Sequence, residues 1–376
     1  MSRKSIRVLV VDDSRLIREA LCDALAQHAD MQVVGTCSDG FEALDALERL
    51  HPDVVTLDLQ MPRLDGLETL DRLLTSRPTP VIVVSALTQR AADVTLQALD
   101  RGAMDYVAKP DGGAEMRRVF GEELSQKIRN MAGADVRRVL QLRKTKQLRA
   151  AVRKAVVVES HDRLEQFVGC IAIGISTGGP PALAQLFSAL APPLPPIVIV
   201  QHMPQMFTGP FANRLNSLSA IRVREAATGD ILRPNEAIVA PGGKHLSLRR
   251  MAARVEVSIT DGDPVSGHKP SVDVMMCSAA KVFGRACVGV IMTGMGRDGA
   301  DGCGAIRAAG GYIIGQDESS SDVYGMNKTA FVEGHVDLQA KLSDLPEVIT
   351  SQARRRCIAA QTTTTCSRSL LLRKGS

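Results

Sequence analysis

The chain contains no tryptophan, and its 376 residues include only three tyrosines and eight phenylalanines. Proteins that bind single-stranded nucleic acid stack bases on aromatic side chains, so this sequence offers few platforms for such binding. The net charge of +5 comes from two segments, because residues 115–155 contain 12 Lys and Arg against 4 Asp and Glu, and residues 351–376 contain 6 against none. The remainder is acidic, and we expect no nucleic-acid partner.

Long apolar runs are also missing. A membrane-spanning helix requires roughly 20 apolar residues, and the longest stretches here are strand-length pieces such as IVIV and VGVIM. The first residues lead directly into IRVLVV without the apolar core of an export signal. None of the eight cysteines forms a C-x-x-C pair, which predicts reduced, buried thiols rather than disulfides or metal ligands. We therefore expect a soluble, cytoplasmic protein that is not embedded in a membrane.

Two stretches of the chain alternate strand-like and helix-like patterns. The first covers about 110 residues, in which β-branched runs such as IRVLVV and PVIVVSA are separated by amphipathic patterns such as RLIREALCDALA. The second begins near Phe167 and ends near residue 350. Such alternation predicts two α/β domains, each built on a doubly wound parallel sheet. We predict domains at 1–130 and 166–350, a basic linker at 131–165, and a disordered basic tail at 351–376, where no period would bury a face.

Polar residues follow the strands of the first domain at the points where the strands end. They are Asp12 and Asp13 after the first strand, Asp58 after the third, Ser85 after the fourth and Lys109 after the fifth. Because the carboxyl ends of parallel strands meet at one edge of the sheet, these side chains should converge. A helix cap explains any single one of them but not the whole set. Neighbouring carboxylates repel one another unless a cation intervenes, and Asp12, Asp13 and Asp58 form a hard oxygen site that suits Mg²⁺.

Asp58 is the candidate nucleophile of a phosphoryl-transfer site, because it stands alone at the central strand end in the segment DLQMPRLDG. Its product would be an aspartyl phosphate. With the elements D-D, D-x-x-M-P-x-x-D-G, S-A and K-P, residues 5–125 resemble the receiver domains of two-component signalling. The resemblance implies a flavodoxin-like fold in which Ser85 and Tyr106 shift to report phosphorylation, with Lys109 as a further switch residue.

The second domain contains a G-x-S-x-G motif in GISTGGP, between a strand and a helix. Its glycines allow a tight turn that exposes the Ser176 hydroxyl, and the helix N-terminus offers N–H groups to an anion. A helix-capping serine or a phosphate-binding loop would give the same motif. His202 ends the next strand and Asp298 follows a later one, in the turn MGRDG, so both should reach the same sheet edge as Ser176. Together the three form a candidate Ser-His-Asp triad.

Other residues compete for these roles. His245 and His268 also lie in loops of the second domain, but His202 is favoured because it stands at a strand end. Four acids compete with Asp298, and each is expected to cap a turn or face solvent: Asp261, Asp263, Asp273 and Asp301. The chain order Ser, His, Asp differs from the Ser, Asp, His order of α/β-hydrolases, so we expect another topology.

A series of further motifs accompanies the candidate triad. They occur in the order GISTGGP, QHMP, FANRL, APGGKHL, KPSVDVMM, TGMGRDGADG and GQDESSS. With them, residues 5–345 resemble the chemotaxis protein-glutamate methylesterase (CheB) family, which implies a Rossmann-like three-layer second domain. The chain departs from the family at Ile175, where a small residue is usual, at Asn327, where proline is common, and in its basic tail. These departures bear on substrate fit more than on catalysis.

The resemblance implies a phosphorylation-activated hydrolase of chemotactic adaptation. It would remove methyl groups from γ-glutamyl methyl esters of methyl-accepting chemoreceptors and deamidate selected receptor glutamines, with a chemotaxis histidine kinase as phosphodonor. Ser176 would attack, His202 would relay the proton and Asp298 would orient His202. The backbone N–H of Met295 would contribute to the oxyanion hole. Ester hydrolysis would need no cofactor, whereas receiver phosphorylation would need Mg²⁺.

Two other classes of function stay open. One is a non-catalytic adaptor with a vestigial triad, which the intact Ser176, His202 and Asp298 argue against. The other is a DNA-binding response regulator. The strands after residue 165 disfavour it, because they leave no compact helix-turn-helix pattern.

Overall fold

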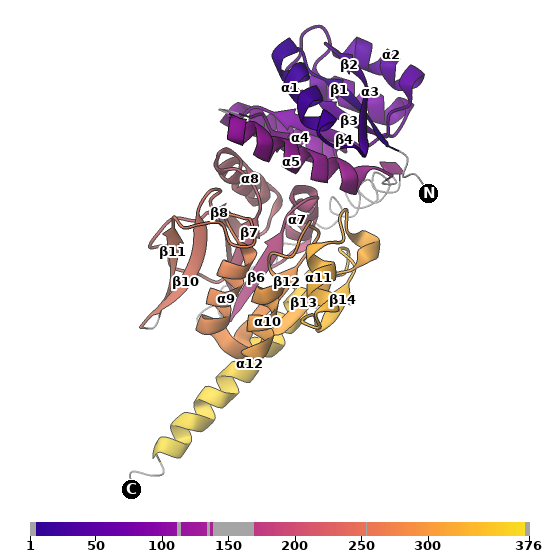
Figure 1. Ribbon diagram of the computed structural model, residues 1–376. Coiled ribbons are helices and arrows are strands. Elements are labelled where there is room, and N and C mark those ends of the chain that lie inside the picture. Colours follow the sequence, from indigo (N-terminus) through magenta and orange to yellow (C-terminus); the bar gives the residue numbers. More distant parts are fainter. Residues whose placement is uncertain (1–4, 111–113, 134–135, 138–168, 253, 373–376) are drawn as a thin grey trace. The chain divides into compact units, whose positions relative to one another are not determined.

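The structure is a computed structural model that describes residues 5–110, 114–133, 136–137, 169–252 and 254–372, with only the backbone of 114–117 and 359–372. The chain divides into two compact units, Met1–Thr145 and Lys146–Ser376. Both are drawn in Figure 1. Each unit is an α/β domain built on a parallel sheet, which confirms the predicted fold class. Most of the predicted linker, at 138–165, lies outside the described residues.

The first unit contains a five-stranded parallel sheet in the order β2-β1-β3-β4-β5. Its strands are β1 (Ile6–Val11), β2 (Met31–Cys37), β3 (Val54–Leu57), β4 (Val81–Ser85) and β5 (Asp105–Ala108). Its helices are α1 (Arg15–Ala26), α2 (Gly40–Leu50), α3 (Gly66–Ser76), α4 (Gln89–Arg101) and α5 (Ala114–Met131). This is the flavodoxin-like order, in which ligands bind at the switch point between β1 and β3.

Close packing fixes the loop that follows β3. The strand itself forms because all of its residues, Val54–Leu57, are buried between the helical layers. Asp65 then caps α3 by accepting a hydrogen bond from the backbone N–H of Glu68, at 2.8 Å. A Cβ atom on Gly66 would lie 2.3 Å from the Cα of Leu59. The loop therefore requires glycine there, and it holds the end of β3 in one position.

The second unit contains a seven-stranded parallel sheet in the order β14-β13-β12-β6-β7-β9-β8, and an antiparallel hairpin of β10 and β11. Its strands are β6 (Cys170–Ile175), β7 (Ile197–Gln201), β8 (Arg222–Glu225), β9 (Glu236–Val239), β10 (His245–Met251), β11 (Arg254–Thr260), β12 (Cys287–Ile291), β13 (Tyr312–Gln316) and β14 (Leu338–Ala340). Its helices are α7 (Gly179–Ala189), α8 (Gln205–Leu218), α9 (Val272–Phe283), α10 (Ala300–Ala308), α11 (Met326–Val332) and α12 (Leu345–Leu372), with short 3₁₀ turns at Gly284–Ala286 and Glu318–Ser320.

The centre of this sheet is apolar on both faces, as expected for a parallel sheet covered by helices. Every residue of β6, β7 and β12 is buried. Figure 1 shows α9 and α10 in front of the sheet, and Met275 and Met276 of α9 belong to its buried core. A sheet of this size also argues against the DNA-binding alternative, because the second domain of such a regulator would be a compact helical domain.

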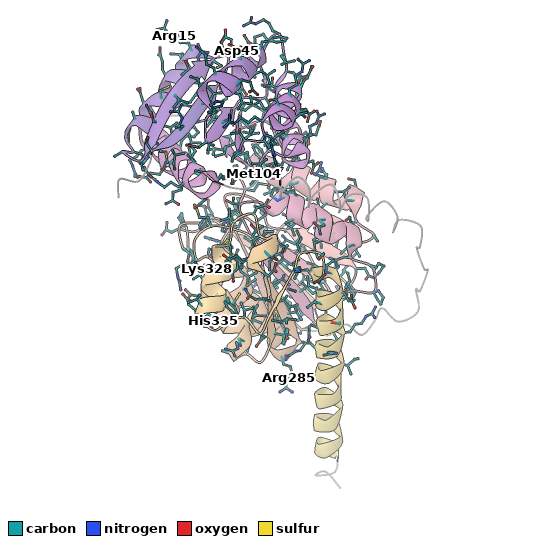
Figure 2. The ribbon with its side chains drawn as sticks, turned by 90° about the vertical axis from the view of Figure 1, so that its right-hand side faces the viewer. Arg15, Asp45, Met104, Arg285, Lys328 and His335 are labelled. Carbon is teal, nitrogen blue, oxygen red and sulfur yellow. The ribbon has the colours of Figure 1, made fainter. Side chains whose placement is uncertain are left out.

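The prediction of a disordered tail is wrong for residues 351–372, because α12 continues from Leu345 to Leu372; residues 373–376 lie outside the described part of the chain. Its side chains at every fourth position are buried: Leu345, Ile349, Ala353 and Cys357. A four-residue spacing gives one narrow stripe along a helix, which is easily missed among the charged residues around it. In Figure 2 the helix continues past Arg285, beyond the rest of the unit. In the described part of the chain, no helix is long and apolar enough to cross a membrane.

Candidate active sites of the two units

The first unit brings its three predicted acids together. Asp12 and Asp13 follow β1, Asp58 follows β3, and one carboxylate oxygen from each lies within 4.8 Å of the others. Asp12 and Asp58 are buried, whereas Asp13 is exposed. Oxygen ligands in such a group, open on one side, fit a hard divalent cation such as Mg²⁺.

Lys109 joins this group from the end of β5. Its Nζ atom lies 2.8 Å from Oδ2 of Asp12 and 2.9 Å from Oδ2 of Asp58. Burial raises the pKa of Asp12, and the Lys109 ammonium opposes this rise while the Asp58 charge adds to it. Burial acts to lower the pKa of Lys109, but its bonds to both carboxylates raise it. The Lys109 ammonium thus compensates the burial of Asp12 only in part, and a further cation beside Asp12 would favour its charged form.

The other two predicted receiver residues lie in β4 and β5. Ser85 is buried at the end of β4, and its Oγ atom is 2.7 Å from Oγ1 of Thr95. Tyr106 is buried within β5, and burial raises the pKa of its hydroxyl. The Nζ atom of Lys127 lies 5.2 Å from the Tyr106 ring and donates to the Tyr106 carbonyl at 2.6 Å. Both residues therefore occupy packed, hydrogen-bonded surroundings in this state.

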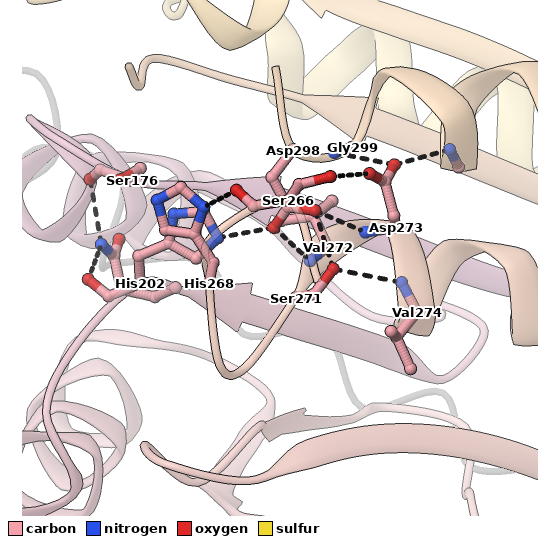
Figure 3. A network of polar contacts seen from close by, with 12 residues as sticks. Ser176, His202, Ser266, His268, Ser271, Val272, Asp273, Val274, Asp298 and Gly299 are labelled. Carbon is pink, nitrogen blue, oxygen red and sulfur yellow. Dashed lines mark hydrogen bonds and ion pairs between the residues drawn. The ribbon is translucent and has the colours of Figure 1, made fainter. Parts of the chain in front are cut away.

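The second unit places its predicted triad on three adjacent strands. Ser176 follows β6, His202 follows β7 and Asp298 lies in the turn after β12. The Nε2 atom of His202 is 2.8 Å from Oδ2 of Asp298 (Figure 3). The backbone N–H of Ser176 donates to the carbonyl of Thr293 at 3.0 Å, which ties the serine turn to the end of β12.

Asp298 accepts hydrogen bonds at both carboxylate oxygens and has no exposed surface. Oδ1 receives the Ser271 hydroxyl at 2.7 Å and the Asp273 N–H at 3.1 Å, and Oδ2 receives the Val272 N–H at 2.7 Å. These donors form the N-terminus of α9, where the helix dipole favours a negative charge. Burial would raise the pKa of Asp298, but the bond to His202 and these donors lower it to about 2. The group is a carboxylate at neutral pH.

His268 is the closest of the competing histidines. Its ring stacks on that of His202, with centroids 3.8 Å apart and 10° between the planes. Atoms of His202, His268 and Asp298 lie within 4.8 Å of one another. Parallel stacked rings direct their in-plane lone pairs side by side rather than to one point, so this arrangement does not suit a tetrahedral metal. His245 instead is buried, with Nε2 2.9 Å from the carbonyl of Asp263.

Among the competing acids, Asp273 is buried and lies close to Asp298. Its Oδ1 atom accepts the N–H groups of Gly299 at 2.9 Å and Gly302 at 2.8 Å, so it caps the start of α10. Burial raises its pKa to about 6, and the charge of Asp298 contributes to the rise. Asp301, in contrast, is exposed and pairs with Arg297 at 2.9 Å.

The turn that carries Met295 lies directly against the serine. A Cβ atom on Gly294 would be 2.8 Å from the Cβ of Ser176, so only glycine allows this approach. The N–H of Gly294 itself donates to the carbonyl of Val323 at 3.0 Å. Met295, the predicted oxyanion donor, is the next residue of this turn.

Gln201 was not singled out in the sequence, although it lies between the serine and the histidine. Its Nε2 atom donates to the carbonyls of Ser176 at 2.9 Å and His202 at 3.1 Å. A Cβ atom on Gly179 would lie 1.9 Å from its Oε1 atom, which explains the second glycine of the GG pair. The sequence did offer a signal for Gln201, because it is the polar last residue of an otherwise apolar strand.

Comparison with known proteins follows the same division into two units. The CheB methylesterase family model matches residues 171–349, and the response regulator receiver domain model matches residues 8–121. A protein-glutamate methylesterase/protein-glutamine glutaminase of Geobacter metallireducens is 45% identical over 92% of this chain and 95% of its own. The chain belongs to the CheB methylesterase family. The predicted family is thereby confirmed.

A further curated relative and a solved structure are also similar to this chain. A protein of Salmonella typhi with the same name is 42% identical over 91% of this chain and 95% of its own. The crystal structure of the Thermotoga maritima CheB methylesterase catalytic domain is 35% identical, with a TM-score of 0.48, over 49% of this chain and 97% of that one. The present chain is thus an enzyme, a CheB-family methylesterase with a response regulator receiver domain.

Proposed function

We propose that this CheB-family enzyme hydrolyses γ-glutamyl methyl esters of methyl-accepting chemoreceptors and deamidates selected receptor glutamines. The catalytic residues would be Ser176, His202 and Asp298. The observation that carries the proposal is the 2.8 Å bond between His202 and the buried Asp298, beside the strand-to-helix turn of Ser176. The names of the relatives, protein-glutamate methylesterase/protein-glutamine glutaminase, support the substrate class.

In this proposal the Ser176 hydroxyl attacks the ester carbonyl while His202 accepts its proton. Because Nε2 of His202 is bonded to Asp298, the proton would pass to Nδ1. The tetrahedral intermediate collapses, the same proton leaves with methanol, and a glutamyl ester of Ser176 remains. Water then attacks this ester by the reverse proton path and releases the glutamate side chain. With a glutamine substrate, ammonia leaves in place of methanol.

Two further groups would stabilise charge during these steps. Asp298, whose pKa is about 2, would remain a carboxylate and stabilise the imidazolium of His202. The N–H of Met295 would donate to the oxyanion, since Gly294 brings this turn against Ser176. Every group in this scheme belongs to the chain itself, so ester hydrolysis would need no cofactor.

We also propose that Asp58 accepts a phosphoryl group from a chemotaxis histidine kinase. Asp12, Asp13 and Asp58 would hold Mg²⁺, which fits their oxygens within 4.8 Å and the incompletely compensated burial of Asp12. Bound Mg²⁺ supplies positive charge that neutralises phosphoryl oxygens. Lys109 would pair with the new phosphoryl group. Ser85 and Tyr106 would change position to report it, and this would activate the methylesterase unit.

Replacing the nucleophile tests the catalytic proposal. Ser176→Ala should reduce methanol release from methylated receptor by several orders of magnitude, because the only proposed attacking group is lost. Ser188→Ala, on the helix that follows Ser176, removes a hydroxyl that donates to the Gln185 carbonyl at 2.8 Å and should leave turnover unchanged. Near-normal turnover of Ser176→Ala would refute the proposed triad.

A further inference from the structure

Thr293 lies two positions after the end of β12. It contacts both the turn that carries Ser176 and the end of β13. It is almost completely buried. Its carbonyl accepts the N–H of Ser176 at 3.0 Å, and its own N–H donates to Oε1 of Gln316 at 3.0 Å. The backbone of Thr293 therefore connects the nucleophile turn to the end of β13.

The hydroxyl of Thr293 connects a third segment. It lies 3.0 Å from the carbonyl of Thr177 and 3.2 Å from that of Val323, and it accepts the N–H of Val323 at 2.9 Å. A threonine hydroxyl has one proton and two lone pairs, so it can donate to one carbonyl while it accepts from Val323. One buried hydroxyl thus ties the residue after Ser176 to the loop between β13 and α11.

That loop in turn holds the proposed oxyanion turn. Gly294 donates to the Val323 carbonyl at 3.0 Å and accepts the N–H of Met326 at 2.9 Å. Gly294 also contacts Ser176 without space for a Cβ atom, and the turn cannot move away from the serine without breaking the bond from the Ser176 N–H to the Thr293 carbonyl. Met295, the proposed oxyanion donor, is the next residue.

Two further residues, Gln316 and Asn327, hold the Thr293 segment and the Val323 loop in place, and neither has any exposed surface. The side chain of Gln316 donates from Nε2 to the Ser320 carbonyl at 2.7 Å, and the backbone carbonyl of Gln316 accepts from Nδ2 of Asn327 at 2.8 Å. Nδ2 of Asn327 also donates to Oγ of Ser321 at 2.8 Å. The GQDESSS segment and the start of α11, which take part in no proposed chemical step, thus hold Thr293 and its loop.

We infer that Thr293 is a positioning residue of the methylesterase reaction, which fixes the distance between the Ser176 hydroxyl and the Met295 N–H. The inference rests on the proposed function. Reacting groups and oxyanion donors must be held within a fraction of an ångström, and a displacement of about 1 Å can cost about 100-fold in rate. The methyl group of threonine could be kept by a variant without the hydroxyl, so shape and hydrogen bonding can be separated.

The test compares Thr293→Val with Thr293→Ser in the full-length chain, with methylated receptor as substrate. Valine keeps the shape and loses the hydroxyl, and we expect kcat to fall on the order of 10- to 100-fold with KM changed less than about threefold. Serine keeps the hydroxyl and should retain kcat within about threefold. The matched control is Thr350→Val on α12, which loses a hydroxyl bond of 2.7 Å to the Pro346 carbonyl away from the site and should keep wild-type kcat.

The outcomes separate this inference from the function on which it rests. If wild type is active, Ser176→Ala is inactive and folded Thr293→Val matches wild type, the positioning role is refuted while the triad stands. Equal losses in Thr293→Val and Thr293→Ser would also refute it, because the hydroxyl would not matter. If Ser176→Ala stays active, the proposed function fails and the positioning role fails with it. Should Thr293→Val not fold, Thr293→Cys, whose thiol is a weak donor, takes its place with the same expected loss in kcat.

Discussion

Asp298→Asn should damage both catalysis and stability, and the two effects follow from separate contacts. An amide has one oxygen where the carboxylate has two, yet Asp298 faces three hydrogen-bond donors besides His202. If the amide nitrogen faces His202, it donates to Nε2 and forces the proton onto Nδ1, which then can no longer act as the base. A wrong tautomer in a catalytic triad costs about 10⁴-fold in kcat. We expect a loss of about 10³- to 10⁴-fold in methanol release.

The stability effect can be worked out from the pKa. A buried carboxyl whose pKa falls from 3.8 to about 2 on folding gains roughly 2 kcal/mol of stability in its charged form. Because the folded pKa is the lower one, this contribution is fully present above pH 4 and is lost as the pH falls through about 2. Urea unfolding at neutral pH should therefore show a loss of about 2 kcal/mol in Asp298→Asn.

Asp301→Asn is the matched control, because it makes the same chemical change at an exposed position of α10. It should keep wild-type kcat and lose no more than about 0.5 kcal/mol of unfolding free energy. If Asp298→Asn retained more than about one tenth of wild-type kcat, His202 would not depend on Asp298 for its tautomer. A variant as stable as wild type would show that the charge at the start of α9 contributes nothing to folding.

Two other predictions concern the receiver. Asp58→Asn keeps the size of the side chain but cannot form an acyl phosphate, so a small phosphodonor with Mg²⁺ should no longer stimulate methanol release. The control Asp45→Asn, at an exposed position of α2, should respond to the phosphodonor as wild type does. Phosphate labelling that persists in Asp58→Asn would show that another residue is the nucleophile. If the receiver restrains the methylesterase unit by a few kcal/mol, a fragment beginning near residue 160 should outpace the unphosphorylated full-length chain on receptor and ignore the phosphodonor. A folded fragment that is no faster would mean that phosphorylation assists catalysis rather than relieves inhibition.

The strand ends could be read from the sequence because parallel sheets follow simple rules. Runs such as IVIVQH are apolar until the last one or two residues, so the polar residue that ends them lies at the sheet edge. This rule brought Asp12, Asp58 and Lys109 together, and likewise His202 and Asp298. A continuous apolar run can be recognised without knowledge of the partner strand, which is why the central strands could be predicted.

Elements at the margins of the second unit escaped the same reasoning. The edge strand β8, RVRE, is only partly buried, so its pattern differs little from that of a loop. The hairpin of β10 and β11 is rich in arginine and exposed near its turn. The stacking of His268 on His202 joins two residues 66 positions apart. Contacts of this kind depend on loop conformations that local sequence does not determine.

The close approach of Gly179 to Gln201 has a consequence for how this family can vary. With a would-be Cβ at 1.9 Å from Oε1, alanine at position 179 would displace the Gln201 amide, which is bonded to the carbonyls of Ser176 and His202. Position 179 therefore depends on position 201, because a side chain at 179 fits only when the side chain at 201 is shorter. Aligned relatives should show substitutions at 179 only alongside a shorter side chain at 201, and redesign of the serine turn must begin by changing both together.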